Sequence, residues 1–273
     1  MNTVPGYQTE AVLGRGRASV VVRAHDIRQG RKVALKLARR TPLAAAAAAP
    51  DFSAEFAAAS ALAHRHVLQV FAHGVAGDDA WLSMELANGS LAAQPAALRA
   101  ARAGQWLREA AMALAQLHRQ GWVHRDVKPA NLLLRADGSL ALADFGCARP
   151  RGTIDPRPHG SAAGAAGAFA VVGTPRYAAP EQSQGAPAQS PADVYSLGAV
   201  LYEMLCGQPL FPGETLTELF CQHQLATVPR LPDPHGAWQP LIDAMLDKDP
   251  RGRPCDGNAL LAELQRTATR GLA

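Results

Sequence analysis

The chain has 273 residues, of which 48% are hydrophobic and 18% charged, so it can bury a sizeable core and is neither fibrous nor wholly disordered. Its net charge of +4 includes no block of basic residues, which argues against a nucleic-acid-binding protein and leaves a weak preference for anionic ligands. The four cysteines lie far apart without a C-x-x-C pair, so we expect neither a disulfide framework nor a zinc ribbon, and a reducing cytoplasm suits them. We expect no signal peptide, because a basic region followed by an apolar one is missing, and no membrane segment, because no uncharged apolar run reaches about 18 residues.

The first third of the chain is typical of β-strands. Short β-branched or apolar runs predict strands over residues 20–25 and 32–38, and the glycine-containing stretch between them, residues 26–31, predicts a hairpin turn. Two further apolar runs predict strands over residues 67–75 and 80–86.

Helical spacing appears first between these two pairs of strands. Asp51 or Ser53 could cap a helix there, because four apolar residues recur at helical spacing: Phe52, Phe56, Ala59 and Leu62. A second helix is predicted over about residues 104–120, and the rest of the chain is mostly helical, broken by loops rich in Pro and Gly. A strand-rich part followed by a helical part predicts an α+β protein with its boundary near residues 85–90.

One long segment, residues 150–170, has no apolar period and is rich in Gly, Pro and Ala. Loops of this length inside a compact domain are usually functional or mobile.

A glycine-containing turn lies near the start of the chain, in the stretch LGRGRASVV that begins at Leu13. Gly14 and Gly16 let backbone N–H groups approach phosphate oxygens closely, while Ser19 stands where a G-x-G-x-x-G pattern has its third glycine. The pattern alone is compatible with an ordinary turn, and because no helix follows it, a dinucleotide-binding fold is disfavoured.

A lysine, Lys36, lies inside the apolar strand that contains VALK. A buried ammonium is costly without an anionic partner, and Glu55 on the following helix is a candidate partner. The alternative is an edge-strand lysine whose aliphatic stem packs while its ammonium reaches water.

The stretch HRDVKPANLLL, which begins at His124, combines charged residues and an amide with an apolar run. It predicts a rigid polar loop, anchored by a strand, that holds the acid Asp126, the amine Lys128 and the amide Asn131 over a reacting group. Further along, Asp144 follows an apolar strand and precedes Phe145 and Gly146. It is either a turn-capping aspartate or an oxygen ligand for Mg²⁺.

In this order, the glycine loop, strand lysine, helix glutamate, HRDVKPAN, DFG and AAPE (which ends at Glu181) resemble the eukaryotic-type protein kinase family, over about residues 7–264. GTPRYAAPEQ, DVYSLG and DPRGRP belong to the same resemblance, and Lys128 with the GTP motif resembles the serine/threonine branch in bacterial form. The resemblance implies a two-lobed kinase fold, with an antiparallel sheet and one main helix in residues 1–87 and a mostly helical lobe in residues 88–273. It also implies ATP with Mg²⁺, or Mn²⁺ in its place, bound between the lobes.

The resemblance further implies a role for each matching residue. Gly14 and Gly16 would cover the ATP phosphates, and Lys36 would hold the α- and β-phosphates while pairing with Glu55. The adenine would lie among the remaining nucleotide-binding residues: Leu13, Val21, Ala34, the gatekeeper Met84, and the backbone of Glu85 and Ala87.

In the large lobe, Asp126 would accept the proton of the substrate hydroxyl, and Lys128 would lie beside the γ-phosphate. Asn131 and Asp144 would hold the metal. The resemblance also implies that Thr174 links the activation segment to Asp126 and Lys128, and that Glu181 and Arg253 form a structural ion pair. His124, His118 and Cys147 are interpreted as packed structural residues.

The activation segment departs from the family pattern. Related bacterial kinases carry threonines shortly before the GT of GTPxY, but residues 164–172, GAAGAFAVV, contain no hydroxyl group, and the nearest upstream candidates are Thr153 and Ser161. Arg125, which often receives the phosphate in this family, is present. The hypothesis is that the kinase is constitutively competent or is switched by an activating partner protein.

Three other functions fit the sequence less well. A pseudokinase scaffold usually lacks the strand lysine or one of the two aspartates, and all three are present here. A small-molecule kinase lacks the GTPxYxAPE segment that docks a polypeptide. A plain interaction domain does not explain Lys36 and Asp144 together.

Overall fold

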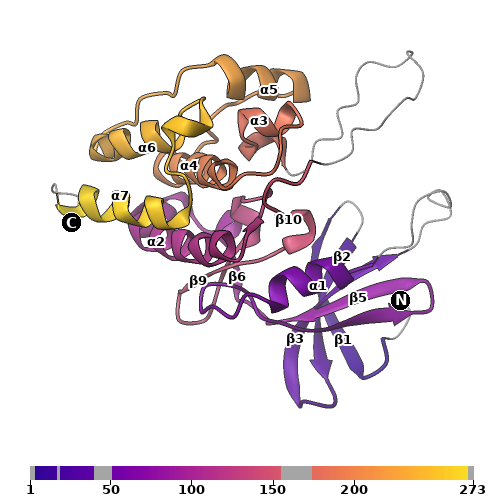
Figure 1. Cartoon of the computed structure of the whole chain (residues 1–273). Helices are drawn as coiled ribbons and strands as arrows, with labels where there is room; N and C mark the ends of the chain where they lie inside the picture. The colour runs from indigo at the N-terminus through magenta and orange to yellow at the C-terminus, as the bar shows by residue number, and fades with distance from the viewer. Residues whose placement is uncertain (1–3, 17–18, 40–50, 155–173, 270–273) are drawn as a thin grey trace.

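The computed structural model describes residues 4–16, 19–39, 51–154 and 174–269. Figure 1 shows that these residues form a strand-rich part, built around one sheet with helix α1 against it, and a part that contains all the longer helices. The predicted long segment, residues 150–170, lies mostly outside the described residues, as do residues 164–172 and Ser161.

The strand-rich part is a five-stranded antiparallel sheet in the order β1-β2-β3-β5-β4. Its strands are β1 (Tyr7–Arg15), β2 (Ser19–Asp26), β3 (Arg31–Arg39), β4 (Val70–Ala76) and β5 (Asp79–Met84). One face buries an apolar cluster around Val22, Val33 and Leu35, because alternate residues of a strand point to the same side. The other face packs Leu82 against α1 (Ser53–Ser60) through Phe52.

The predicted hairpin turn between β2 and β3 is confirmed. The Asp26 carboxylate accepts hydrogen bonds from the backbone N–H groups of Arg28 and Gln29 at 3.0 and 3.1 Å, and Gly30 has a φ of 63°, which favours glycine.

Two of the predicted boundaries in this part are wrong. The strand expected from residue 67 begins at Val70, because Val67 bridges to Leu142 and the Leu68 amide donates to the Leu142 carbonyl, so both residues are bound to the helical part instead. The N-cap of α1 is Phe52, without a side-chain cap, rather than Asp51 or Ser53. Asp51 nevertheless contacts the first turn, because its carboxylate accepts the Ser53 N–H at 2.9 Å.

The helical part is built around α2 (Ala96–Arg119) and the almost fully buried α4 (Ser190–Cys206), whose side chains meet in one core with those of α6 and α7. The other helices are α3 (Pro180–Ser183), α5 (Leu216–Leu225), α6 (Gln239–Met245) and α7 (Gly257–Thr269), with 3-10 turns at Leu91–Ala93, Pro129–Asn131, Phe145–Cys147, Pro175–Tyr177, His235–Trp238 and Pro250–Gly252. Five short strands complete it: β6 (Gly89–Ser90), β7 (Trp122–Val123), β8 (Leu132–Leu134), β9 (Leu140–Leu142) and β10 (Arg149–Pro150). Within the described residues, no helix has the length and apolar character needed to cross a membrane.

The second helix begins earlier than predicted. Gly104 marked its expected start, but the glycine lies inside α2, which starts at Ala96 after Pro95. Gly104 packs against Trp238, because a Cβ at residue 104 would lie 3.4 Å from the Trp238 ring. The alanine-rich first turns gave no clear apolar period, so the sequence pattern did not mark this start.

Candidate active site

The ammonium of Lys36 lies between two carboxylates that come from different parts of the chain. From strand β3, its Nζ donates to both oxygens of Glu55 on α1 at 2.9 Å and to Oδ1 of Asp144 at 2.8 Å. The Lys36 and Glu55 side chains are only 13% and 8% exposed, so the alternative of an edge-strand lysine reaching water is wrong. Gly146 packs closely here, because a Cβ on it would lie 3.3 Å from Glu55 Oε2.

One ammonium does not neutralise two ionised carboxylates. Burial raises the pKa of Glu55, and Lys36 opposes that rise only in part. Partial desolvation alone would raise the pKa of Asp144, but the neighbouring Lys36 outweighs it and holds this pKa below its ordinary value. Burial alone would lower the pKa of Lys36, and the two carboxylates together hold it above the ordinary value. The ammonium is therefore shared between two carboxylates, of which Asp144 has its pKa lowered and Glu55 has its pKa raised.

A second polar cluster is formed by the loop of His124–Arg125–Asp126–Val127–Lys128 and by Thr174. Lys128 Nζ donates to Asp126 Oδ2 at 2.6 Å and to the Thr174 hydroxyl at 2.7 Å, and that hydroxyl donates to Asp126 Oδ1 at 2.9 Å. Asn131 donates to both the carbonyl and the Oδ2 of Asp126, at 2.9 and 3.1 Å. The Asp126 carboxylate is thus held on both oxygens.

The two clusters are neighbours along a hydrogen-bonded hairpin. Strands β8 and β9 pair between Leu132 and Leu142, and the Ala143 N–H donates to the Asn131 carbonyl at 2.9 Å. Asn131, just before β8, and Asp144, just after β9, therefore lie at the same end of this hairpin. Asp144 has a φ of 65°, a left-handed conformation that is uncommon for a residue other than glycine.

The loop is anchored by Asp193, a residue for which the sequence predicted no role. This fully buried carboxylate on α4 accepts the backbone N–H groups of His124 and Arg125, both at 2.7 Å, and lies 2.9 Å from Nε2 of His118. These bonds lower the pKa of Asp193 although burial opposes them. The sequence signal that could have identified Asp193 is a lone aspartate before the apolar run of α4, because a buried charge needs partners.

The residues interpreted as structural are packed as expected. His124 is fully buried, and its Nδ1 accepts the Asp126 N–H, so Nε2 carries the proton and donates to the Ala143 carbonyl at 3.1 Å. Burial and the nearby Asp126 raise the pKa of the Cys147 thiol, which disfavours a reactive thiolate.

The predicted nucleotide-binding residues of the sheet lie in register with the lysine. Val21 on β2 pairs with Gly14 on one side and with Lys36 on the other, and Ala34 on β3 pairs with Met84. Leu13, beside Gly14, is half exposed, and Ala87 packs with Met84 against the cluster of Leu68, Ala141 and Ala143. The backbone N–H of Glu85 donates to the Gln69 carbonyl at 2.8 Å.

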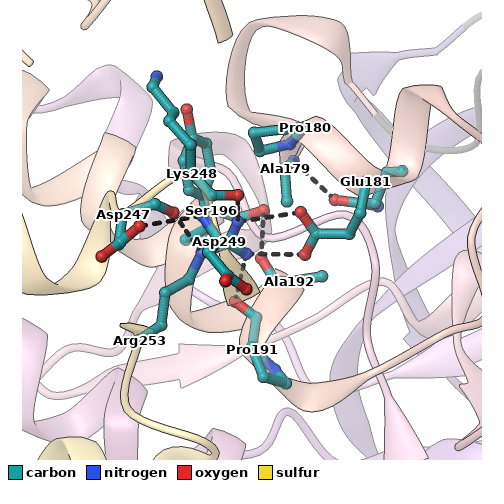
Figure 2. Close-up of polar contacts among 12 residues, drawn as sticks. Ala179, Pro180, Glu181, Pro191, Ala192, Ser196, Asp247, Lys248, Asp249 and Arg253 are labelled. Carbon is teal, nitrogen blue, oxygen red and sulfur yellow. Dashed lines mark hydrogen bonds and ion pairs between the residues drawn. The ribbon is translucent and has the colours of Figure 1, made fainter. Parts of the chain in front are cut away.

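The ion pair of Glu181 and Arg253 is present in the helical part. Figure 2 shows the Arg253 guanidinium between Glu181 and the carbonyl groups around it. Its two terminal nitrogens donate to the Glu181 carboxylate at 2.7 and 3.0 Å. The guanidinium also donates to the backbone carbonyls of Pro191, Asp247 and Lys248. Arg253 is 4% exposed.

Comparison with known proteins agrees with this arrangement. The protein kinase domain model matches residues 7–263. The chain is 33% identical to the serine/threonine-protein kinase drp72 of Corynebacterium efficiens over 266 residues, 94% of this chain and 49% of that protein. It is 31% identical to PknA of Corynebacterium glutamicum, over 93% of this chain and 54% of PknA, and 32% identical to PknL of Mycobacterium tuberculosis, over 96% of this chain and 65% of PknL.

The chain therefore belongs to the protein kinase family, and the predicted two-lobed α+β kinase fold is confirmed. The sheet with α1 corresponds to the small lobe and the helical part to the large lobe. The chain spans about half the length of the first two of these relatives.

Proposed function

We propose that this chain is a serine/threonine protein kinase that transfers the γ-phosphate of ATP to hydroxyl groups of proteins, including its own. The triangle of Asp126, Lys128 and Thr174 carries the proposal. It binds a carboxylate and an ammonium to the segment that leads into Glu181, so the groups needed for phosphoryl transfer and the polypeptide-docking segment form one unit. The relatives named above as serine/threonine-protein kinases support the same activity.

In this proposal Asp126 accepts the proton of the substrate hydroxyl and Lys128 lies beside the transferred phosphoryl group. Phosphoryl transfer requires mainly positioning and charge neutralisation, with little covalent chemistry from the protein. The contacts of Thr174 and Asn131 with the two oxygens of Asp126 support such positioning.

The nucleotide would bind along the face of the sheet that carries Lys36. Lys36, oriented by Glu55, would hold the α- and β-phosphates. Because the Glu85 amide already donates to Gln69, the Glu85 carbonyl and the Ala87 backbone are the groups that would meet the adenine edge. The remaining contacts would come from Leu13, Gly14, Gly16, Val21, Ala34 and Met84.

Asn131 and Asp144 would hold Mg²⁺ or Mn²⁺. Among the residues that the structure describes, no three His, Cys, Asp or Glu side chains gather into a metal site of their own. Mg²⁺ commonly takes one or two carboxylates together with substrate phosphates and water, so one aspartate and one amide fit an ion that arrives with the nucleotide. The lowered pKa of the Asp144 carboxyl supports this assignment, and the ion would neutralise charge on the phosphates.

Three further features belong to the proposal. The lobes divide at residues 87 and 88. The protein acts in the cytoplasm, which its four free cysteines support. Activation does not depend on the activation-loop phosphothreonines that are usual in related bacterial kinases, because residues 164–172 contain no hydroxyl group. The kinase is instead constitutively competent or switched by a partner protein.

Incubation of the purified chain with labelled ATP and Mg²⁺ or Mn²⁺ tests the proposal, with an acceptor protein present and Asp144→Ala as the matched variant. We expect label on serine or threonine with the wild type only. Absence of label, with normal folding and ATP binding, would favour either a scaffold or a kinase that requires its activating partner. Site mapping with Thr153→Ala and Ser161→Ala tests activation, because a large loss of activity in either would contradict independence from loop phosphorylation.

A further inference from the structure

The side chain of Gln182 joins helix α3 to the loop that carries Asp126. Gln182 directly follows Glu181, and its Nε2 donates to the carbonyl oxygen of Arg125 at 3.1 Å. Its Oε1 accepts the backbone N–H of Ala179 at 2.9 Å. Both partners are backbone groups with a single possible role, which fixes the orientation of the amide.

The carbonyl that Gln182 holds belongs to the peptide group between Arg125 and Asp126. Arg125 has a φ of 69°, so its backbone is left-handed without being glycine, a conformation that persists only where surrounding contacts determine it. Asp193 holds the Arg125 N–H at 2.7 Å, and His124 Nδ1 accepts the Asp126 N–H at 3.3 Å. Gln182 donates to the carbonyl oxygen, which is the other polar atom of this peptide group.

Helix α3 is itself well anchored, so it can act as a fixed point. Glu181 is bound to the buried Arg253, and the Ser183 hydroxyl accepts a hydrogen bond from Gln224 on α5 at 3.0 Å. The docking segment thus reaches the catalytic loop twice, through Thr174 at the Asp126 side chain and through Gln182 at the backbone that carries it.

We propose that Gln182 is a positioning residue that holds the Arg125–Asp126 peptide group, and with it the Asp126 carboxylate, in the orientation needed for phosphoryl transfer. This inference rests on the proposed kinase function. Small displacements of a catalytic group cost about ten- to a hundredfold in rate, so the loss should appear in kcat more than in the KM for ATP.

Two variants separate the donor from the rest of the side chain. Gln182→Glu keeps an acceptor for Ala179 but, when ionised, cannot donate to the Arg125 carbonyl, whereas Gln182→Met loses both contacts. We expect kcat to fall about tenfold or more in both at pH 8, with the KM for ATP changed less than about twofold. Gln29→Glu, an exposed change of the same charge in the β2–β3 turn, is the control and should match the wild type.

The pH profile tests the donor itself. A protonated glutamic acid has the shape of glutamine and donates again, and a carboxyl of ordinary pKa is about 40% protonated at pH 4.5. The deficit of Gln182→Glu relative to wild type should therefore shrink as the pH falls from 8 to 4.5, while that of Gln182→Met should not. Wild-type kcat in both variants would overturn the proposal, as would a Gln182→Glu deficit that is the same at every pH.

Hydrogen exchange keeps this inference distinct from the kinase proposal. If the wild type transfers no phosphate, kcat cannot test Gln182, and the inference is judged by the exchange of backbone amides in residues 121–131. Faster exchange there in both variants would support the link, and unchanged exchange would overturn it.

Discussion

Replacement of Arg253 by methionine should destabilise the protein far more than the same replacement two residues earlier, at Arg251. Both arginines pair with a carboxylate. Arg253 is 4% exposed and uses all its donors on Glu181 and three backbone carbonyls (Figure 2). The Arg251 side chain is 91% exposed and pairs with Asp249, which is 49% exposed.

The difference in magnitude follows from burial. Removal of Arg253 leaves the Glu181 carboxylate, 13% exposed, without its counter-charge, and breaking a buried ion pair in this way costs about 3–5 kcal/mol of the free energy of unfolding. For a domain of this size that corresponds to a fall in Tm of roughly 6–20 °C. Water solvates both members of the exposed pair, so Arg251→Met should leave Tm unchanged.

Thermal unfolding followed by circular dichroism, with urea unfolding as a second measure, tests this prediction. The double variant Glu181→Met/Arg253→Met should regain part of the loss, because the penalty comes from an unpaired buried charge rather than from the missing bond. Equal and small shifts for the two single variants would refute the reasoning from burial. A double variant less stable than Arg253→Met alone would refute the assignment of the penalty to Glu181.

Three other predictions follow from single contacts. The Arg135 guanidinium binds the Glu85 carboxylate and, at 2.7 Å, the Arg65 carbonyl, so Arg135→Gln should weaken ATP binding several-fold in calorimetry, and an unchanged Kd would contradict this coupling. Burial lowers the pKa of His223 from 6.5 to about 4, so as the pH drops this histidine is protonated in the unfolded chain before it is protonated in the folded one. The free energy of unfolding therefore falls as the pH drops from 6.5 toward 4. Between pH 7 and pH 5 this group should remove about 2 kcal/mol in urea unfolding, and a His223→Gln variant with the same pH slope would exclude it as the cause. Thr174→Val should lower kcat about tenfold with little change in the KM for ATP, because Asp126 loses one of its contacts, and an unchanged kcat would argue against that contact.

The sequence alone predicted the hairpin between β2 and β3 and the strand that carries Lys36, since both depend on short-range patterns of apolar and turn residues. The start of α2 was misjudged because alanine-rich turns carry no apolar period. Gly104 lies inside the helix and packs against the ring of Trp238, which lies more than a hundred residues away in the sequence. The strand expected at residue 67 begins later for a similar reason. Pairing with Leu142, a long-range choice, outweighs local strand preference there.

The order of the motifs was sufficient to assign the chain to the kinase family, and it supplied the candidate residues one by one. What it could not supply is the network between them. Lys36 bridges Glu55 and Asp144, Asp193 holds two backbone amides, and Gln182 reaches the Arg125 carbonyl, over separations from 19 to 108 residues. Local sequence determines which groups are available, because backbone propensity and apolar period act over a few residues. Only the packed fold decides which of them meet, because burial makes an unpaired charge or amide costly and so selects the arrangement in which each has a partner.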